Sequence, residues 1–515
     1  MKESRDVIKS EFRYYLTNVA RSARRTSDGF NLGSSAVSSF MAFIEPKKLF
    51  DYAPERWQHI ESMYDITEPE EVKKITNELL NDESFMNHDY ADNQQYRSGA
   101  LMHYTCFINA RSFFGRQKMG KRQTINNDVL LNAPNIYRPY ITAIISKPFL
   151  LLAGISGTGK SRIVRELARA CWEAGSEEYK AQKPKNFEMV QVKPNWHDSS
   201  ELIGYVSRVS GSPVFVAGNF LKFVAKAWKN PEVPYFLCLD EMNLAPVEQY
   251  FAEYLSVVES RKCDENGVIT TDPILKKCDE QWYFDLTAQL TTDEDIRAQF
   301  NKDGIAIPQN LIVVGTVNMD ETTFSFSRKV LDRAMTIEMN EVNLRGGLES
   351  QHEQIGKLEA GNLIGTAVEG VDIYNANKDV CDMALKYLEA VNAQLEGTPF
   401  KVAYRTRNEF LLYVVNNLPY NKDKDGNELD ENYVIARALD EITSMKILSR
   451  IEGDETKIGN LLDRLTATVT EQLKTISGKD YSAKKDEANK EYSVSLAKLA
   501  EMKKRLESGY TSFWS

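Results

Sequence analysis

The sequence predicts an α/β protein built on a five-stranded parallel sheet, with a helical domain before it and a helical lid after it. Three observations lead to this prediction. Short apolar runs alternate with helical stretches in the middle of the chain, a glycine-rich phosphate-binding loop follows the first run, and apolar residues recur at helical spacing on both sides. We therefore divide the chain into a helical N-terminal domain, a linker, a sheet domain, a helical lid and a C-terminal helical tail, at 1–115, 116–140, 141–342, 343–470 and 471–515.

The composition is that of a folded, acidic protein. The 515 residues include 64 Lys and Arg against 74 Asp and Glu, a net charge of −10, and 42% are apolar. This balance argues against a chain that coats nucleic acid or acidic lipid through its overall charge. The longest apolar stretch, Pro148–Ala153, is far too short to cross a bilayer. With six scattered cysteines and no CxxC pair, we expect a cytoplasmic protein that has no structural zinc and does not bind a membrane.

The first 115 residues are expected to be helical. Apolar spacing predicts helices over Asp6–Val19, Ala36–Phe43, Glu68–Leu80 and Gly99–Phe113. The polar linker that follows holds several basic residues, which indicate either a solvated face or a nucleic-acid contact. The first 25 residues carry seven basic and three acidic side chains, a local charge of +4, and are the other candidate DNA contact.

Five strands are predicted in the sheet domain. They are Phe149–Ala153, Glu188–Val192, Tyr235–Leu239, Leu311–Thr316 and Thr336–Met339. Strands that alternate with helices favour a parallel sheet covered on both faces. Residues 263–309 form an insertion in which we expect two further strands, Val268–Thr271 and Gln281–Asp285.

The strongest motif is the phosphate-binding loop Gly154-Ile-Ser-Gly-Thr-Gly-Lys160-Ser161, which matches G-x-x-x-x-G-K-[ST] in full. A strand enters it and a helix leaves it, so backbone N–H groups and the helix N-terminus can surround the phosphates. The lysine can reach the β- and γ-phosphates, and the serine hydroxyl can ligate Mg²⁺. The residues that we expect to hold the nucleotide here are Gly154, Ser156, Gly157, Thr158, Gly159, Lys160 and Ser161.

Polar residues also follow two other predicted strands. Asp240 and Glu241 end an apolar run, where the first would hold Mg²⁺ with Ser161 and the second would orient the attacking water. Asn318 follows the next strand and could contact the γ-phosphate or that water. These positions predict nucleoside-triphosphate hydrolysis, with ATP or GTP as the nucleotide and Mg²⁺ as the metal.

Several motifs together resemble McrB-type AAA+ proteins, the motor subunits of modification-dependent restriction systems, close to dynein-related and MoxR ATPases. They are Asp240-Glu-Met-Asn243-Leu-Ala, Gly315-Thr-Val-Asn318-Met-Asp320 and Val330-Leu-Asp-Arg333-Ala. The resemblance covers about residues 141–345 and continues more weakly through Tyr404–Glu409. In that clade a β-hairpin interrupts the second core helix, and here Tyr205–Gly218 would be that hairpin.

The resemblance implies an AAA+ core and a homo-oligomer, in particular a hexameric ring, that acts with DNA and a separate McrC-like nuclease of PD-(D/E)xK type. Arg333 would reach the nucleotide of a neighbouring subunit, and its alternative is a salt bridge with Asp332 or Glu338. Arg405 on the lid would contact nucleotide, with Arg407 as the rival for that role. McrB is a GTPase, but no NKxD guanine motif is present, so the base stays open.

Three functions compete at this point. The first is a motor of a restriction or anti-phage defence system that moves or remodels DNA and activates its nuclease. The second is a MoxR-like chaperone that remodels protein partners. The third is a nucleotide sensor or scaffold with little turnover, which the complete set of Asp240, Glu241 and Arg333 argues against.

Overall fold

The computed structural model describes most of the chain from residue 137 onward and shorter stretches before it. From 137 to 515 the exceptions are residues 210, 265–266, 320–323, 341–354, 424–425, 486 and 515. Before 137 the described residues are 8–9, 12–13, 16, 21–26, 29–31, 41, 62–66, 69–82, 100–105 and 107–108. The expected linker at 116–140 and the expected helix Ala36–Phe43 therefore lie almost wholly outside the described residues. The chain divides into two compact units, Met1–Ile125 and Asn126–Ser515.

The N-terminal unit contains helix α4 (Pro69–Leu80), which confirms one predicted helix, and the 3-10 turn η2 (Met63–Asp65). It also contains an antiparallel pair, β1 (Arg21–Thr26) and β2 (Gly29–Asn31). The expectation of an entirely helical domain is wrong at this pair. Only Ser27 and Asp28 separate the two strands in the sequence, and two residues are the commonest length of a hairpin loop.

Four buried aromatic residues form the core of the N-terminal unit. The ring of Phe12 lies 5.1 Å from that of Tyr104 and 5.3 Å from that of Phe107. Tyr64 lies edge-on to Tyr104 at 5.7 Å, and the Tyr104 hydroxyl donates to the Ile66 carbonyl over 3.2 Å. These aromatic side chains join the described residues around positions 12, 64 and 104–107, so they are core residues.

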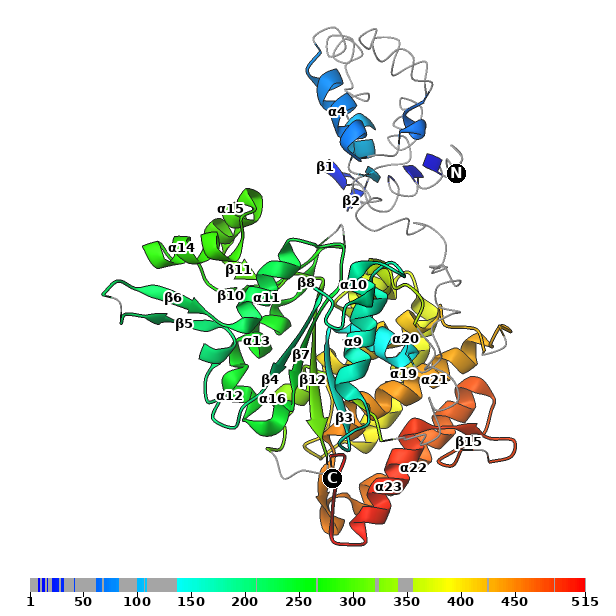
Figure 1. Cartoon of the computed structure of the whole chain (residues 1–515). Coiled ribbons are helices and arrows are strands. Elements are labelled where there is room, and N and C mark those ends of the chain that lie inside the picture. Colours follow the sequence, from blue (N-terminus) through cyan, green and yellow to red (C-terminus); the bar gives the residue numbers. More distant parts are fainter. Residues whose placement is uncertain are drawn as a thin grey trace. The chain divides into compact units, whose positions relative to one another are not determined.

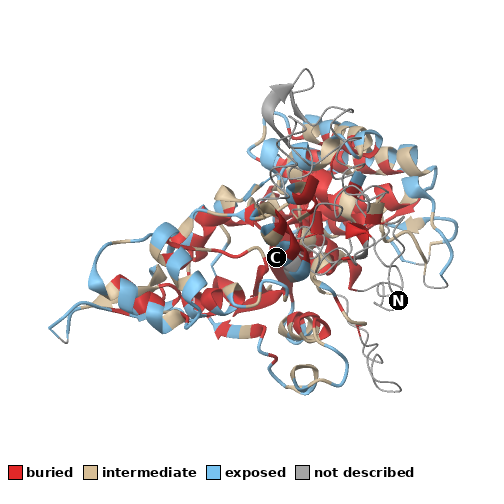
Figure 2. Cartoon of the chain, turned by 90° about the horizontal axis from the view of Figure 1, so that it is seen from above, coloured by how far each residue is buried: buried red, intermediate tan, exposed pale blue. Residues whose placement is uncertain are grey.

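The second unit is an α/β structure around a five-stranded parallel sheet in the order β13-β3-β12-β7-β4 (Figure 1). Each strand lies within two residues of its predicted bounds. They are β3 (Phe149–Gly154), β4 (Phe187–Gln191), β7 (Tyr235–Asp240), β12 (Leu311–Asn318) and β13 (Met335–Glu338). The three central strands are buried almost from end to end (Figure 2), which explains their continuous apolar runs.

Helices cover both faces of this sheet (Figure 1). Leu150 and Leu152 point into one hydrophobic cluster, which includes side chains of α8 (Arg138–Ser146) and α9 (Lys160–Ala170). Phe149 and Leu151 alternate into a second cluster on the other face. The helices of that second face are α11 (Asn219–Trp228), α12 (Val247–Tyr250), α13 (Ala252–Val257) and α16 (Arg328–Leu331).

The predicted hairpin is present as β5 (Gly204–Ser207) and β6 (Val214–Ala217), which pair antiparallel and project from the sheet domain in Figure 1. The later insertion contains β8 (Lys262–Cys263), β9 (Ile269–Thr270), β10 (Pro273–Leu275), α14 (Gln281–Leu290), α15 (Glu294–Asp303) and β11 (Ile305–Ala306). The predicted strand at 281–285 is wrong. Its apolar residues continue at helical spacing, and Tyr283, Leu286 and Thr287 are buried on one side of α14.

Short turns connect these elements. They are α10 (Glu177–Lys180) and the 3-10 turns η3 (Ser199–Glu201), η4 (Met242–Leu244) and η5 (Val258–Ser260). No helix among the described residues has the length and apolar character that a membrane span needs.

A helical lid follows the sheet. Its helices are α17 (Ala360–Leu363), α18 (Gly370–Tyr374), α19 (Lys378–Gln394), α20 (Tyr404–Asn417), α21 (Glu431–Lys446), the 3-10 turn η6 (Leu448–Arg450) and α22 (Glu455–Ser477). The expected lid–tail boundary at residue 470 falls inside α22. The tail then adds β15 (Tyr481–Ser482), β16 (Glu491–Tyr492), α23 (Val494–Leu506) and β17 (Tyr510–Ser512), which pairs with β14 (Glu452–Asp454).

The lid is attached to the sheet domain by packing and by buried charge. Its helices share the cluster formed by α8, α9 and one face of the sheet. The Arg138 guanidinium on α8 forms a two-pronged ion pair with Glu441 on α21, at 2.5 and 2.8 Å. Burial raises the pKa of Glu441, but Arg138 outweighs it and leaves that pKa below its ordinary value. The pair stays charged and fixes α21 against α8.

Candidate nucleotide-binding site

The phosphate-binding loop connects the end of β3 to the first turn of α9, as predicted. Gly157 and Gly159 have φ of 84° and 85°, a left-handed conformation that residues with a Cβ rarely adopt. A Cβ on Gly154 would lie 2.7 Å from the Met339 carbonyl oxygen, so the close approach of the chain after β13 also requires glycine there. The three glycines therefore fix the curled shape of the loop.

Lys160 crosses the loop from its helical end. Its buried ammonium group donates to the carbonyls of Gly154 and Ile155, both at 2.8 Å. Among the described residues, no acceptor is present for the backbone N–H groups of Gly157, Thr158 and Gly159. One ammonium group and a row of N–H groups on a curled loop fit a phosphate chain.

Ser161 and Asp240 come together beside the loop. The Ser161 hydroxyl donates to Asp240 Oδ1 over 2.7 Å, and the Thr316 hydroxyl donates to the same oxygen over 2.8 Å. Hydroxyl and carboxylate oxygens are the ligands that Mg²⁺ prefers, usually one or two from the protein with the rest from water and phosphate. The donor set therefore fits Mg²⁺, although the described residues contain no cluster of three or more His, Cys, Asp or Glu.

Glu241 is held in an unusual backbone conformation directly after β7. Its φ of 54° and ψ of 51° are left-handed, which is uncommon without glycine and gathers at functional sites. Its N–H donates to the Thr316 hydroxyl over 3.0 Å, and its carboxylate accepts from the Asn318 amide over 3.3 Å. The structure thus places the predicted water-orienting carboxylate within reach of the predicted γ-phosphate contact.

The sheet order explains why these residues meet. β12 lies between β3 and β7, and Asn318 is the register partner of Gly154. Because all three strands are parallel, their carboxyl ends open onto one edge, where ligands of open α/β sheets bind. Residues 154–161, 240–241 and 318 are therefore brought together by topology.

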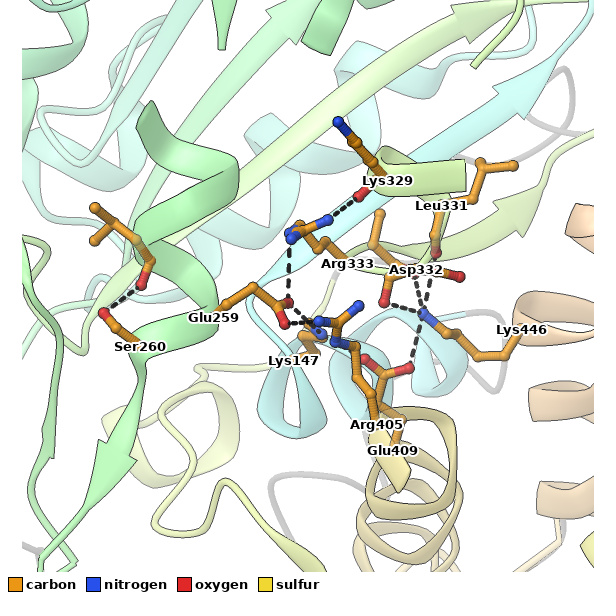
Figure 3. A network of polar contacts seen from close by, with 12 residues as sticks. Lys147, Glu259, Ser260, Lys329, Leu331, Asp332, Arg333, Arg405, Glu409 and Lys446 are labelled. Carbon is orange, nitrogen blue, oxygen red and sulfur yellow. Dashed lines mark hydrogen bonds and ion pairs between the residues drawn. The ribbon is translucent and has the colours of Figure 1, made fainter. Parts of the chain in front are cut away.

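Arg333 and Arg405 lie elsewhere. Arg333 precedes β13, whose first residue Met335 pairs with Leu150 at the start of β3. From Leu150 to Gly154 is about 13 Å at the rise of a β-strand, so Arg333 lies at the amino end of the sheet. There both arginines meet Glu259 of η5: Arg333 Nε lies 3.6 Å from its carboxylate, and Arg405 forms a direct ion pair with it (Figure 3). Within one chain neither arginine joins the phosphate-binding loop.

Arg407, the rival of Arg405, turns toward its own helix. Its guanidinium donates to Asn408 Oδ1 over 2.9 Å and lies over the Tyr404 ring at 5.0 Å. The alternative partners suggested for Arg333 are not used either, since its ion pair is with Glu259. Its Nη1 donates to the Lys329 carbonyl over 2.7 Å.

The sequence did not single out three residues that hold the predicted site residues in place. Thr316 bridges Asp240 and Glu241, and as the polar end of an apolar strand it could have been noticed. Asn340, just past β13, accepts from the Ile155 N–H over 2.9 Å and so fixes the loop from the far side. Glu259 lies in a turn with no motif of its own, so no sequence signal points to it.

The C-terminal helix α23 reaches the same edge. Lys498 on α23 donates to Glu338 over 2.8 Å, and Glu338 accepts from the Asn340 amide at 2.5 Å. The start of α23 is fixed by the buried Asp440 carboxylate, which accepts from the Ser493 hydroxyl and the Val494 N–H at 2.6 and 2.8 Å. Burial raises the pKa of Asp440 to about 6, although these hydrogen bonds oppose the shift.

Comparison with known proteins adds one match. A family described as a domain of unknown function (DUF8727) matches residues 365–510, from the lid through α23 to the first residue of β17. No curated protein matches the chain. The match covers the helical region that holds Arg405 and leaves the phosphate-binding loop outside it.

Proposed function

We propose that this protein is an AAA+ nucleoside-triphosphatase that uses ATP or GTP with Mg²⁺. The observation that carries the proposal is the convergence of the phosphate-binding loop, the Ser161–Asp240 pair at 2.7 Å and the Glu241–Asn318 pair at 3.3 Å on one sheet edge. Each contact joins side chains that are far apart in the sequence. A glycine-rich turn without function would need none of them.

In the proposed reaction the loop N–H groups and Lys160 bind the β- and γ-phosphates, and the ammonium group exchanges its two carbonyl contacts for phosphate oxygens. Ser161 and Asp240 would hold Mg²⁺, which when bound neutralises charge between the β- and γ-phosphates. Glu241 accepts a hydrogen bond from the attacking water, while Asn318 orients that carboxylate.

Arg333 and Arg405 enter this scheme from a neighbouring copy. They lie at the amino end of the sheet, on the far side from their own loop, so they can act on a nucleotide only if a second chain presents one. An arginine supplied in trans is worth about 10³–10⁵ in rate in phosphoryl transfer. We therefore propose a homo-oligomer, in particular a hexameric ring.

For the biological role we propose a motor of a restriction or anti-phage defence system, working with a McrC-like nuclease on DNA. A basic surface supports the DNA contact. Five exposed lysines lie on α11, directly after it and on the segment before β4, and four of them, together with Glu188, line a cavity of about 400 Å³. They are Lys183, Lys185, Lys222, Lys226 and Lys229.

A MoxR-like chaperone is the second candidate, and the β5–β6 hairpin favours it. The hairpin exposes four large apolar side chains, with exposed fractions from 44% to 97%. They are Tyr205, Val209, Val214 and Val216. Apolar surface of this kind suits a protein partner better than a phosphate backbone.

Turnover of ATP and of GTP, with and without duplex DNA, tests the proposal together with the mass of the assembly. We expect hydrolysis, an oligomer in the presence of nucleotide, and DNA stimulation that weakens as salt rises. Replacement of Lys226 and Lys229 by Glu should reduce the stimulation of hydrolysis by DNA and leave the rate of hydrolysis without DNA unchanged. Hydrolysis without any DNA response would favour the chaperone, and absence of hydrolysis would reject the enzyme.

A further inference from the structure

We infer that Glu259 is a positioning residue that holds Arg333 and Arg405 as one unit for a neighbouring copy's nucleotide. The inference rests on the proposed function and adds a residue that no motif marks. Glu259 lies in η5, after the helices that cover one face of the sheet, whereas Arg333 comes before β13 and Arg405 lies in the first turn of lid helix α20. One carboxylate therefore joins three separate parts of the fold (Figure 3).

The contact with Arg333 fixes one edge of its guanidinium and leaves another open. Nε faces Glu259 Oε1 at 3.6 Å, and Nη1 donates to the Lys329 carbonyl at 2.7 Å. Among the described residues, no acceptor is present for Nη2. The group is thus oriented through two nitrogens while the third stays available to an oxygen from outside the chain.

Arg405 uses the other oxygen of the same carboxylate. Its Nη2 pairs with Glu259 Oε2, and its side chain remains 41% exposed. Glu259 itself is only 22% exposed, so its charge is partly shielded from water. Two cations that would otherwise repel each other are therefore held side by side, one from the sheet domain and one from the lid.

A buried network behind Glu259 fixes it in turn. Lys147 lies 3.9 Å from Glu259 and also pairs with Glu409 of α20. Glu409 forms an ion pair with Lys446 at 2.7 Å, and the Lys446 ammonium donates to the carbonyls of Leu331 and Ala334, on either side of the Arg333 turn. Lid residues therefore hold both the carboxylate and the backbone that carries Arg333 (Figure 3).

Charge decides what removal of the Glu259 carboxylate would do. Arg333, Arg405 and Lys147 face it, and the other acid of the network, Glu409, is already shared by Lys147 and Lys446. A neutral Gln would leave the two guanidinium groups without a common anion. Because a displacement of about 1 Å can cost 10²-fold in rate, we expect misplacement to appear in turnover and not in nucleotide binding.

The test is a double-mutant cycle in the full-length assembly. Glu259→Gln should lower kcat about 10- to 100-fold with an unchanged Kd for ATP or GTP, and Glu259→Asp should recover part of the loss. Arg405→Ala in the Glu259→Gln background should cost much less than it does in the wild type, because the pair is already broken. Glu253→Gln, an exposed acid on α13, is the matched control and should leave turnover unchanged.

An experiment with mixed subunits distinguishes loss of the arginine positions from damage to the phosphate-binding loop of the mutated subunit itself. Glu259→Gln subunits keep an intact phosphate-binding loop, so adding Lys160→Ala subunits, which keep the arginine pair, should restore part of the turnover. Normal kcat for Glu259→Gln, with Arg333→Ala inactive, would overturn the inference and leave the proposed function standing. Wild-type protein that does not hydrolyse nucleotide would reject the proposed function instead.

Discussion

The two ends of the parallel sheet carry different parts of the proposed chemistry. The carboxyl end carries Lys160, Asp240 and Glu241, the groups that we propose bind a triphosphate and orient water. The amino end carries Arg333 and Arg405 on a shared carboxylate, about 13 Å or more away along the strands. Neither end holds all the groups of the proposed reaction, and this separation is the reason why we propose contact between copies.

The two ends also differ in how they are built. At the carboxyl end the residues follow adjacent strands, so the sheet register alone sets their distances. At the amino end a lid helix and two separate turns of the sheet domain meet through ion pairs, so the arrangement depends on how the lid lies on the sheet. Movement of the lid would therefore disturb the arginine end far more than the phosphate end.

Removal of the arginine end should have the largest effect. Arg333→Ala should lower kcat by about 10³–10⁵ with little change in nucleotide affinity, because the chain's own loop is intact. Mixing it with Lys160→Ala subunits should restore part of the activity, measured as turnover across mixing ratios. Absence of restored turnover at every mixing ratio would contradict the proposed roles of the two ends, because the arginine would then not act between copies.

Glu241→Gln at the carboxyl end should lower turnover by about 10²–10⁴ while nucleotide still binds. The amide keeps the shape of the side chain and loses the negative charge that orients water. Single-turnover hydrolysis and sizing of the nucleotide-bound assembly measure this, and we expect a trapped oligomer. Normal turnover would remove Glu241 from the reaction.

Lys160→Ala should weaken triphosphate binding by about 100-fold, the loss of one strong charge-assisted contact. Calorimetric titration measures it, with Lys180→Ala on the exposed surface of α10 as the control. Undiminished binding in the Lys160 variant would contradict the assignment of this loop.

The smallest expected effect is a change in the stability of α23 with pH. We expect this change at the carboxyl end of the sheet and not at the amino end. The pKa of Asp440 is raised from 3.8 to about 6, so the folded state favours the protonated acid. Its stabilisation is complete below about pH 4 and is lost as pH rises through 6, at most about 3 kcal/mol. The protection factors of the α23 amides, which correct for the base-catalysed rise of exchange with pH, should thus be higher at pH 5 than at pH 7.

Asp440→Asn should remove this pH dependence, while Asp379→Asn, an exposed acid on α19, should leave it. Because α23 contacts Glu338 beside the phosphate-binding loop, exchange near Ile155 should follow that of α23. Exchange around Glu259 should not follow that of α23. A pH response around Glu259 would contradict the proposed difference between the two ends.

Most of the sheet and of the phosphate end could be predicted from the sequence. Buried parallel strands are continuous apolar runs, and the polar residues that follow them must meet at one edge, which places Asp240 and Asn318 correctly relative to Lys160. The prediction of a strand at 281–285 is wrong because the three consecutive aromatic residues Trp282, Tyr283 and Phe284 fit a strand or a helix, and only the continuation of the helix to Leu290 decides between them.

The arginine end could not be predicted in the same way. Glu259 lies 74 positions before Arg333 and 146 before Arg405, and their pairing depends on where the lid docks. That docking rests on buried ion pairs such as Arg138–Glu441, which join segments about 300 residues apart. Spacing along the chain carries no information on such contacts.

The separation of the two ends restricts the symmetry of any working assembly. A two-fold dimer pairs one patch with itself, so it would complete a site only if that single patch contained both the loop and the arginine pair. Head-to-tail stacking joins unlike patches, and it either closes on itself or grows as an open filament. In an open filament the terminal copy would keep a nucleotide that no neighbour can act on. In a closed ring every bound nucleotide would have a neighbouring copy.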